Sequence, residues 1–351
     1  MAGNGDSTAA AAVLAALFAS APLTRPELAE QTGFSRPTVA EANLRIAVAD
    51  LTGTVHVERR QATQGTGARQ VAAQTARMIR SAVRATGTRL GPLRRVGVAA
   101  PGVIHSDGRT MSTAHNLGDD GPFDLLTPLE AAVDAPVVLD NNVNLAALGE
   151  RWRGHAGDVA TFAFLAVGAG IGMGLVHNGE ILRGAHGAAG EVAYLPLPGT
   201  LPVSQRPGHG RERLAAEAGG YGMLAAIASH PSWDGPCPST VEELFAQSAA
   251  GVPAARELVA AEARQLGMTV ASTCAVFDPD LVVLGGGIGS NPQLLPVVRD
   301  TVHALVPFPP RLESSALGEV ASLTGALCVA LDGARDDLAA PLSMTAAAEA
   351  S

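Results

Sequence analysis

Residues 159–174 read VATFAFLAVGAGIGMG, and this stretch decides the class of fold. Its first nine residues are almost all apolar, as in a strand that is buried on both faces. The glycines from Gly168 to Gly174 then allow a tight turn, where an unhindered backbone can bring its N–H groups close to an anion or a nucleotide. Most glycine turns are structural, so the turn alone is a weak indication of a ligand site.

Strands and helices alternate on both sides of this stretch, which is typical of an α/β fold. The sequence predicts a hairpin at 46–60, a helix at 67–89, and strands at 95–100 and 136–139. Near the C-terminus, FDPDLVVLGGGIG places a second glycine run between a strand and a helix. The glycines expected at a nucleotide site, or its remnant, are Gly168, Gly170, Gly172, Gly285, Gly286 and Gly287.

The composition fits a globular chain of about two domains and excludes several chemistries. It has 351 residues, of which 47% are hydrophobic and 16% are charged. All 24 basic residues are arginine, which excludes a Schiff-base mechanism, a Walker-type phosphate lysine and a lysine general base. The three cysteines, Cys237, Cys274 and Cys328, are widely spaced, so we expect no disulfide framework and a reducing cytoplasm.

The charges are distributed unevenly along the chain. Residues 1–100 contain 12 arginines and 6 acids, whereas residues 101–351 contain 12 arginines and 27 acids. A basic N-terminal part, residues 1–100, followed by an acidic remainder indicates nucleic-acid contact in the N-terminal part. Chance clustering is the alternative, because Arg77, Arg80 and Arg84 can lie on one solvated helix face.

A helix-turn-helix is predicted between residues 24 and 42. Thr24 is a good N-cap for a first helix, and Gly33 suits the turn that ends it. Small and β-branched residues stand at the spacings of bacterial repressors, which the segment resembles. An ordinary helical hairpin in a core is the alternative. The residues expected to begin the recognition helix and contact DNA are Ser35, Arg36 and Thr38.

The apolar run at 8–23 is expected to form a packing helix, because alanine and leucine are strong helix formers. It is preceded by Asp6 without any arginine, so it does not fit a secretory signal. It is also too short to span a bilayer, which needs about 20 residues. We therefore expect no membrane partner.

Four glycine- or asparagine-rich segments occur in one order along the chain: DNNVN at 140–144, GAGIGMGLV at 168–176, GAAGE at 187–191 and LGGGIG at 284–289. Together with GVAAPG at 97–102, the set resembles the ROK family (repressor, ORF, kinase) over nearly the whole chain. The resemblance implies a two-lobed, actin-like and hexokinase-like α/β fold of the ribonuclease-H-like type. The implied division is a helix-turn-helix region at 1–44, an N-terminal lobe at 45–156, a C-terminal lobe at 157–335 and a flexible tail at 336–351.

The first departure from the family concerns its general base. In the ROK kinases that this chain resembles, an Asn-Asp pair stands at this position, and its aspartate takes a proton from the sugar hydroxyl that attacks the γ-phosphate. Here the pair is Asn141-Asn142, and an amide is not basic. By resemblance, the sugar-contacting residues are Asn141, Asn142 and Glu191. We expect no catalytic residue and no cofactor.

Two further departures concern zinc and the first strand. The family carries a cysteine-rich zinc loop after the position of Glu191, whereas residues 198–213 contain no cysteine and Tyr194 replaces the family's histidine, so no metal is expected. Family regulators also have a wing, a first strand and a phosphate turn after the recognition helix. Here residues 37–42 run directly into the next strand. The sequence therefore predicts an N-terminal lobe that lacks its central strand and its phosphate turn.

These features favour a transcriptional regulator, most simply a repressor, whose body is a sensor or dimerisation module. The expected partners are a DNA operator, a sugar or sugar phosphate, and a second copy of the chain in a homodimer or tetramer. Two alternatives remain open: an active ATP-dependent sugar kinase, and a degenerate scaffold that binds neither DNA nor sugar.

Overall fold

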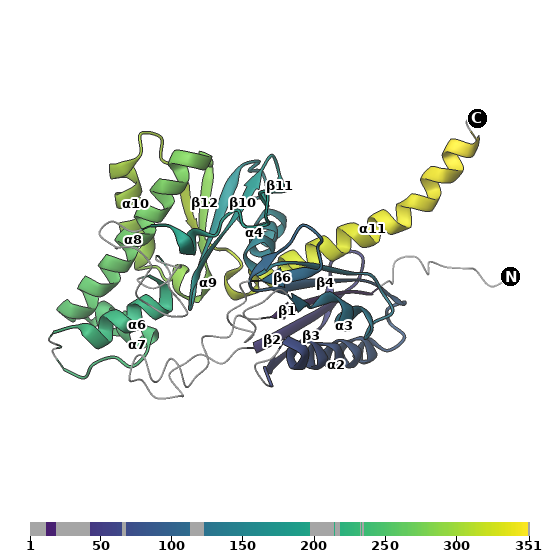
Figure 1. Cartoon of the computed structure of the whole chain (residues 1–351), viewed down its shortest axis with the longest axis horizontal. Helices are drawn as coiled ribbons and strands as arrows, with labels where there is room; N and C mark the ends of the chain where they lie inside the picture. Colours follow the sequence, from purple (N-terminus) through teal and green to yellow (C-terminus); the bar gives the residue numbers. More distant parts are fainter. Residues whose placement is uncertain are drawn as a thin grey trace. The chain divides into compact units, whose positions relative to one another are not determined.

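The computed structural model describes residues 12–18, 43–64, 68–112, 123–196, 214, 218–231, 233 and 235–349. These residues belong to two compact units, whose elements are labelled in Figure 1. The first unit contains the strand at 12–18, the described residues between 43 and 152, and the C-terminal segment from residue 320. The second takes the described residues between 153 and 319.

The first unit is built on a five-stranded sheet with the strand order β3-β2-β1-β4-β8. Its strands are β1 (Ala12–Phe18), β2 (Asn43–Ala49), β3 (Val55–Ala62), β4 (Leu93–Ala100) and β8 (Val137–Asn141). A small second sheet contains β5 (Val103–Ile104), β6 (Thr110–Ser112) and β7 (Phe123–Asp124). The helices described in this unit are α2 (Ala68–Thr86), α3 (Leu126–Glu130), α4 (Asn142–Arg153) and α11 (Ala321–Glu349).

The central strand of this sheet, β1, differs from two predictions made from the sequence. Residues 12–18 form a strand and not part of a packing helix, and this strand fills the central place that was expected to be missing. β1 pairs with β2 in antiparallel and with β4 in parallel orientation. Without it, the backbone groups along the facing edges of β2 and β4 would have no partners, and this requirement outweighs the helix propensity of alanine and leucine.

The sheet of the first unit is covered on both faces by helices. α2 packs on one face, where Ile46 and Val48 join a cluster with Ile79. α11 packs on the other face, where Ala47 and Ala49 lie in a cluster with several leucines of that helix. Figure 1 shows the two helices on opposite sides of the sheet.

The second unit repeats the same arrangement of strands. Its sheet order is β11-β10-β9-β12-β13, with β10 antiparallel to β9 and β12 parallel to β9. The strands are β9 (Phe162–Val167), β10 (Ile171–His177), β11 (Glu180–Ile181), β12 (Leu281–Gly285) and β13 (Arg311–Ser314). The helices described here are α6 (Gly219–Ser229), α7 (Val241–Ala250), α8 (Pro253–Phe277), α9 (Gly286–Gly289) and α10 (Leu294–Leu305). Numbered within each unit, both sheets follow the order 3-2-1-4-5.

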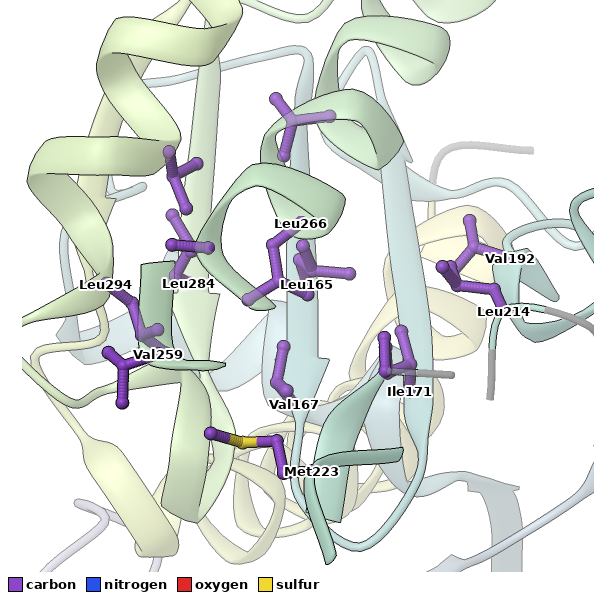
Figure 2. Packing of buried hydrophobic residues seen from close by; sticks show 14 of the residues in the cluster. Leu165, Val167, Ile171, Val192, Leu214, Met223, Val259, Leu266, Leu284 and Leu294 are labelled. Atoms are coloured by element: carbon purple, nitrogen blue, oxygen red, sulfur yellow. The ribbon is translucent and has the colours of Figure 1, made fainter. Parts of the chain in front are cut away.

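A large hydrophobic core stabilises the second unit. Figure 2 shows Leu165 of β9 beside Leu266 of α8, and Leu284 of β12 among the same apolar side chains. Leu165, Leu266 and Leu284 are each 0% exposed. Burying one such side chain contributes roughly 1.5–3 kcal/mol. Val167 and Ile171 belong to this core and flank the glycine turn, which is therefore held at both ends.

Several local predictions are confirmed, and two boundaries are corrected. The hairpin predicted at 46–60 is β2–β3, whose turn is closed by Gly53 N–H donating to Asp50 O at 2.9 Å. The chain from residue 320 returns to the first unit, although the sequence places residues up to 335 in the second lobe. The sequence predicts a flexible tail from residue 336, whereas helix α11 continues to Glu349. Alanine-rich sequence favours a helix, which explains this continuation. Among the described helices, none combines the length and apolar character needed to cross a bilayer.

Candidate functional site

One group of candidate site residues, in the first unit, lies where β8 ends and α4 begins. β4 and β8 are parallel neighbours, and their register places Ala100 beside Asn141. Asn141 Oδ1 accepts hydrogen bonds from the N–H groups of Val143 at 2.7 Å and Asn144 at 3.2 Å, so Asn141 is the N-cap of α4. Its Nδ2 donates to Gly102 O at 2.7 Å, which ties the turn after β4 to the end of β8.

Asn142 is the first residue of α4 and is half-buried. Its backbone oxygen accepts a hydrogen bond from Ser322 Oγ at 2.7 Å. Its side-chain amide has no hydrogen-bond partner among the described residues. This amide is therefore available to a ligand, in contrast to that of Asn141, whose oxygen is used twice by the backbone.

The carboxylate nearest in sequence to Asn142 has a structural role. Asp140 is 5% exposed. Its Oδ1 accepts hydrogen bonds from Asn141 N–H at 2.7 Å and from Asn144 Nδ2 at 3.3 Å. Asp140 thus holds the turn between strand and helix in place and is not directed to solvent.

A separate group of candidate site residues forms the glycine turn of the second unit. Gly168 N–H donates to Gly170 O at 2.9 Å and closes the turn between β9 and β10. The start of α6 packs on this turn, since Gly220 N–H donates to Gly168 O at 2.8 Å. A Cβ atom on Gly220 would lie 3.2 Å from Gly168 O, a tight contact that favours glycine at this position. A Cβ atom on Gly168 or Gly170 would meet nothing within 4 Å, which leaves that backbone accessible.

The glycines after β12 divide into two kinds. A Cβ atom on Gly285 would overlap the ring of Phe164. Gly286 has φ of +82° and would bring a Cβ atom against Val167 O. These two glycines are required by packing. Gly287 has free space around its Cα, as Gly168 and Gly170 do, so these three are the positions at which a ligand can approach the backbone.

A buried carboxylate occupies the N-terminus of α6. Glu262 of α8 is 4% exposed, and its Oε1 accepts a hydrogen bond from Gly219 N–H at 2.8 Å. Burial raises the pKa of Glu262 to about 7, although the hydrogen bond from Gly219 opposes this. Glu262 therefore faces the N-terminus of α6 as an uncharged acid below about pH 7 and as a carboxylate above it. Sequence reasoning missed this residue; the available signal was an acid on the apolar stripe of α8, between Val259 and Leu266.

Glu191 stands after a turn that is fixed to β10. Met173 N–H donates to Gly190 O at 3.1 Å, and a Cβ atom on Gly190 would overlap Met173 O. Gly190 has φ of +85°, a conformation that favours glycine. Glu191 itself is half-buried and precedes the short helix η3 (Val192–Tyr194).

Part of the predicted site lies outside the described residues. This is true of the DNA-contacting residues Ser35, Arg36 and Thr38 and of the segment 197–213, where the family has its zinc loop. The residues of that segment do not fit a cysteine-ligated zinc ion, because none is cysteine. In the part of the chain that the structure describes, no three His, Cys, Asp or Glu side chains are grouped to hold a metal.

The described site residues thus fall into two groups. The first unit places Asn141 and Asn142 at one strand end. The second unit holds Glu191 and the glycines Gly168, Gly170, Gly172, Gly285, Gly286 and Gly287. A repeated 3-2-1-4-5 sheet with polar and glycine-rich strand ends is typical of the actin-like, hexokinase-like α/β fold.

Comparison with known proteins identifies the family. The ROK family model matches residues 41–332, and the chain therefore belongs to the ROK family. It is 30% identical over 238 residues to a glucokinase of Halalkalibacterium halodurans, covering 64% of this chain and 68% of that protein. It is 28% identical over 197 residues to a xylose repressor of Caldicellulosiruptor bescii, covering 54% of this chain and 49% of the repressor.

A solved structure supports the fold assignment over almost the whole chain. The ROK hexokinase of Thermus thermophilus is 28% identical, with a TM-score of 0.69 over 93% of this chain and 99% of that one. The actin-like, hexokinase-like α/β fold predicted from the sequence is therefore confirmed. Sugar kinases and a repressor both occur among the relatives, so membership of the family does not by itself decide between the two activities.

Proposed function

We propose that this protein is a ROK-family transcriptional regulator whose body binds a sugar or sugar phosphate without phosphorylating it. The observation that carries the proposal is Asn142 at the first position of α4. By family resemblance this is the position of the kinase general base. An amide can hydrogen-bond a hydroxyl group but cannot remove its proton. Loss of a general base costs roughly 10²- to 10⁴-fold in rate.

The geometry around Asn142 favours binding. Its amide is unpaired among the described residues, while Asn141 is used as the cap that orients α4. We therefore assign contact with a sugar hydroxyl to Asn142, and positioning of the helix to Asn141. Glu191 follows a turn that is held by β10, and the family resemblance assigns a sugar contact to it as well.

Features of the first hundred residues also support the proposed regulator function. A helix-turn-helix pattern is predicted at 24–42, in the sequence between β1 and β2 and before most of the residues that the family model matches. The first hundred residues are basic, and a xylose repressor is among the relatives. Ser35, Arg36 and Thr38 would contact the operator. In a homodimer, which the family resemblance predicts, two recognition helices would read two half-sites, and a sugar would change their spacing.

The experiment is a DNA-binding titration with the full chain. Fluorescence anisotropy measures binding to the labelled upstream region of its own gene, with and without a panel of hexoses, pentoses and their phosphates. We expect saturable binding that Arg36→Ala abolishes and that one sugar weakens or strengthens at least about tenfold, a coupling of ordinary size. Absence of binding at low salt would contradict the regulator role and favour the scaffold.

A sugar kinase is the second candidate, and one structural observation favours it. Gly168, Gly170 and Gly287 leave the backbone open where a nucleotide could approach. The 30% identity to a glucokinase points the same way. The two functions differ in one measurable quantity, which is the transfer of phosphate from ATP to a sugar.

A further inference from the structure

The helix α2 carries a stripe of arginines that the sugar site does not use. Arg69, Arg77, Arg80 and Arg84 are all exposed. At 100° per residue these positions fall within an arc of about 80°, and they extend over about 22 Å of helix. The helix contains no acidic residue. The four guanidinium groups therefore form a row of positive charges along one face of α2, without any negative charge from the same helix.

The charges of this row are not neutralised by neighbouring carboxylates. Among the described residues, none of the four arginines forms an ion pair; Arg80 donates only to the backbone oxygen of Ala132, at 3.3 Å. Glu130 of α3, the short helix that packs beside α2, is paired with Arg109 at 2.8 Å. A solvated helix face usually mixes both signs in i, i+4 pairs, whereas this one contains one sign only.

The elements next to α2 extend the same charge. Residues 43–100 contain ten arginines and only two acids, Asp50 and Glu58. Asp50 is engaged by His56 at 2.7 Å. The exposed arginines of this region outside α2 are Arg59 and Arg60 of β3, Arg89, and Arg94 of β4. The rest of the chain, residues 101–351, is strongly acidic, with 27 acids against 12 arginines.

We propose that the arginine stripe of α2 (Arg69, Arg77, Arg80 and Arg84) is a second DNA contact, which binds the phosphate backbone of duplex DNA independently of sequence. The inference rests on the proposed regulator function and extends it from the predicted recognition helix to the family domain. Duplex DNA carries one charge per about 1.7 Å on its two strands together, so about 22 Å of duplex carries roughly 13 phosphate charges, more than the four that the stripe needs on the side facing it. Arginine is suited to this contact because its planar guanidinium binds phosphate oxygens in pairs.

The salt dependence of binding to a random-sequence duplex tests the proposal. Each phosphate contact contributes about 0.9 to the slope of log affinity against log salt concentration. We expect the slope of the variant with all four arginines changed to Gln to be smaller than that of the wild type by about 3 to 4. Changing the same four residues to Lys keeps the charge and should keep most of the slope.

A charge-matched variant controls for the change in net charge. It carries Gln at Arg151, Arg183, Arg264 and Arg311, which are exposed but lie outside α2. We expect this variant to keep the wild-type slope. Equal slopes for the α2 variant and the charge-matched variant would overturn the proposal. Circular dichroism melting of each variant establishes that the fold is intact.

The outcomes separate this proposal from the proposed function. If the wild type binds its operator and the α2 variant retains the full slope, the second contact is refuted while the regulator function stands. If the wild type binds no DNA, the regulator function fails as well. Binding to anionic phospholipid vesicles without binding to DNA, lost in the α2 variant, would assign the stripe to a membrane surface and overturn the proposal.

Discussion

Replacing Glu262 by glutamine tests the electrostatics at the centre of the second unit. Glu262 is buried in α8, and one of its oxygens accepts the N–H of Gly219 at the start of α6. Glutamine has nearly the same shape and can accept the same hydrogen bond through its own oxygen. The variant Glu262→Gln therefore removes the ionisation and leaves the packing almost unchanged.

The expected magnitude follows from the pKa. Burial raises the pKa of Glu262 from an ordinary value of 4.5 to about 7. Between these two pH values the folded protein retains a proton that the unfolded chain has lost, so stability falls as pH rises through this window. The pKa difference corresponds to about 3 kcal/mol, with 1.36 kcal/mol for each pH unit. Above pH 7 the contribution of Glu262 is constant.

The assay is urea unfolding of wild type and variant between pH 4 and pH 8. Other groups titrate as well, but the difference between the two proteins isolates Glu262. We expect equal stability at pH 4 within about 1 kcal/mol, and a variant that is more stable by about 3 kcal/mol at pH 8. If the unfolding free energies of wild type and variant differed by the same amount at every pH, the reasoning would be refuted. Such a result would mean that Glu262 has the same pKa in the folded and the unfolded state.

Two further predictions concern packing and capping. Gly285→Ala should destabilise the protein by about 1–3 kcal/mol, because its Cβ atom would overlap the Phe164 ring. Gly287→Ala, in open space, should change the unfolding free energy by less than about 0.5 kcal/mol. Equal effects of the two substitutions in urea unfolding would contradict this. Asn141→Ala should lower the stability by about 1 kcal/mol through loss of the α4 cap, while Asn141→Ser, which retains a capping oxygen and like alanine lacks the amide donor, should lose less. Thermal melting of the two variants measures the difference, and equal losses would contradict the capping role.

The fold could be predicted from the sequence where the pattern was local. Alternation around the Asp50–Gly53 turn gave the β2–β3 hairpin, and the apolar run before Gly168 gave the central strand β9. The strand β1 could not be predicted in this way. Its alanines and leucines favour a helix locally, and only the need of β2 and β4 for hydrogen-bond partners makes this segment a strand.

The site was predicted as a set of residue types but not as a division of roles. Asn141 and Asn142 are identical side chains in adjacent positions, yet one caps α4 and the other is free among the described residues. The glycine runs look alike in the sequence, yet Gly285 is required by Phe164 and Gly287 is not. These distinctions depend on contacts between distant segments, which periodicity and spacing do not contain.

The central claim is that an amide at position 142 leaves a protein that binds a sugar without phosphorylating it. The most direct test measures ADP release by the purified full chain, with ATP, Mg²⁺ and a panel of hexoses, pentoses and amino sugars. We predict no turnover above the background without protein, for every sugar in the panel. Sugar-dependent turnover by the wild type that disappears in Glu191→Ala would contradict the claim and identify the protein as a kinase.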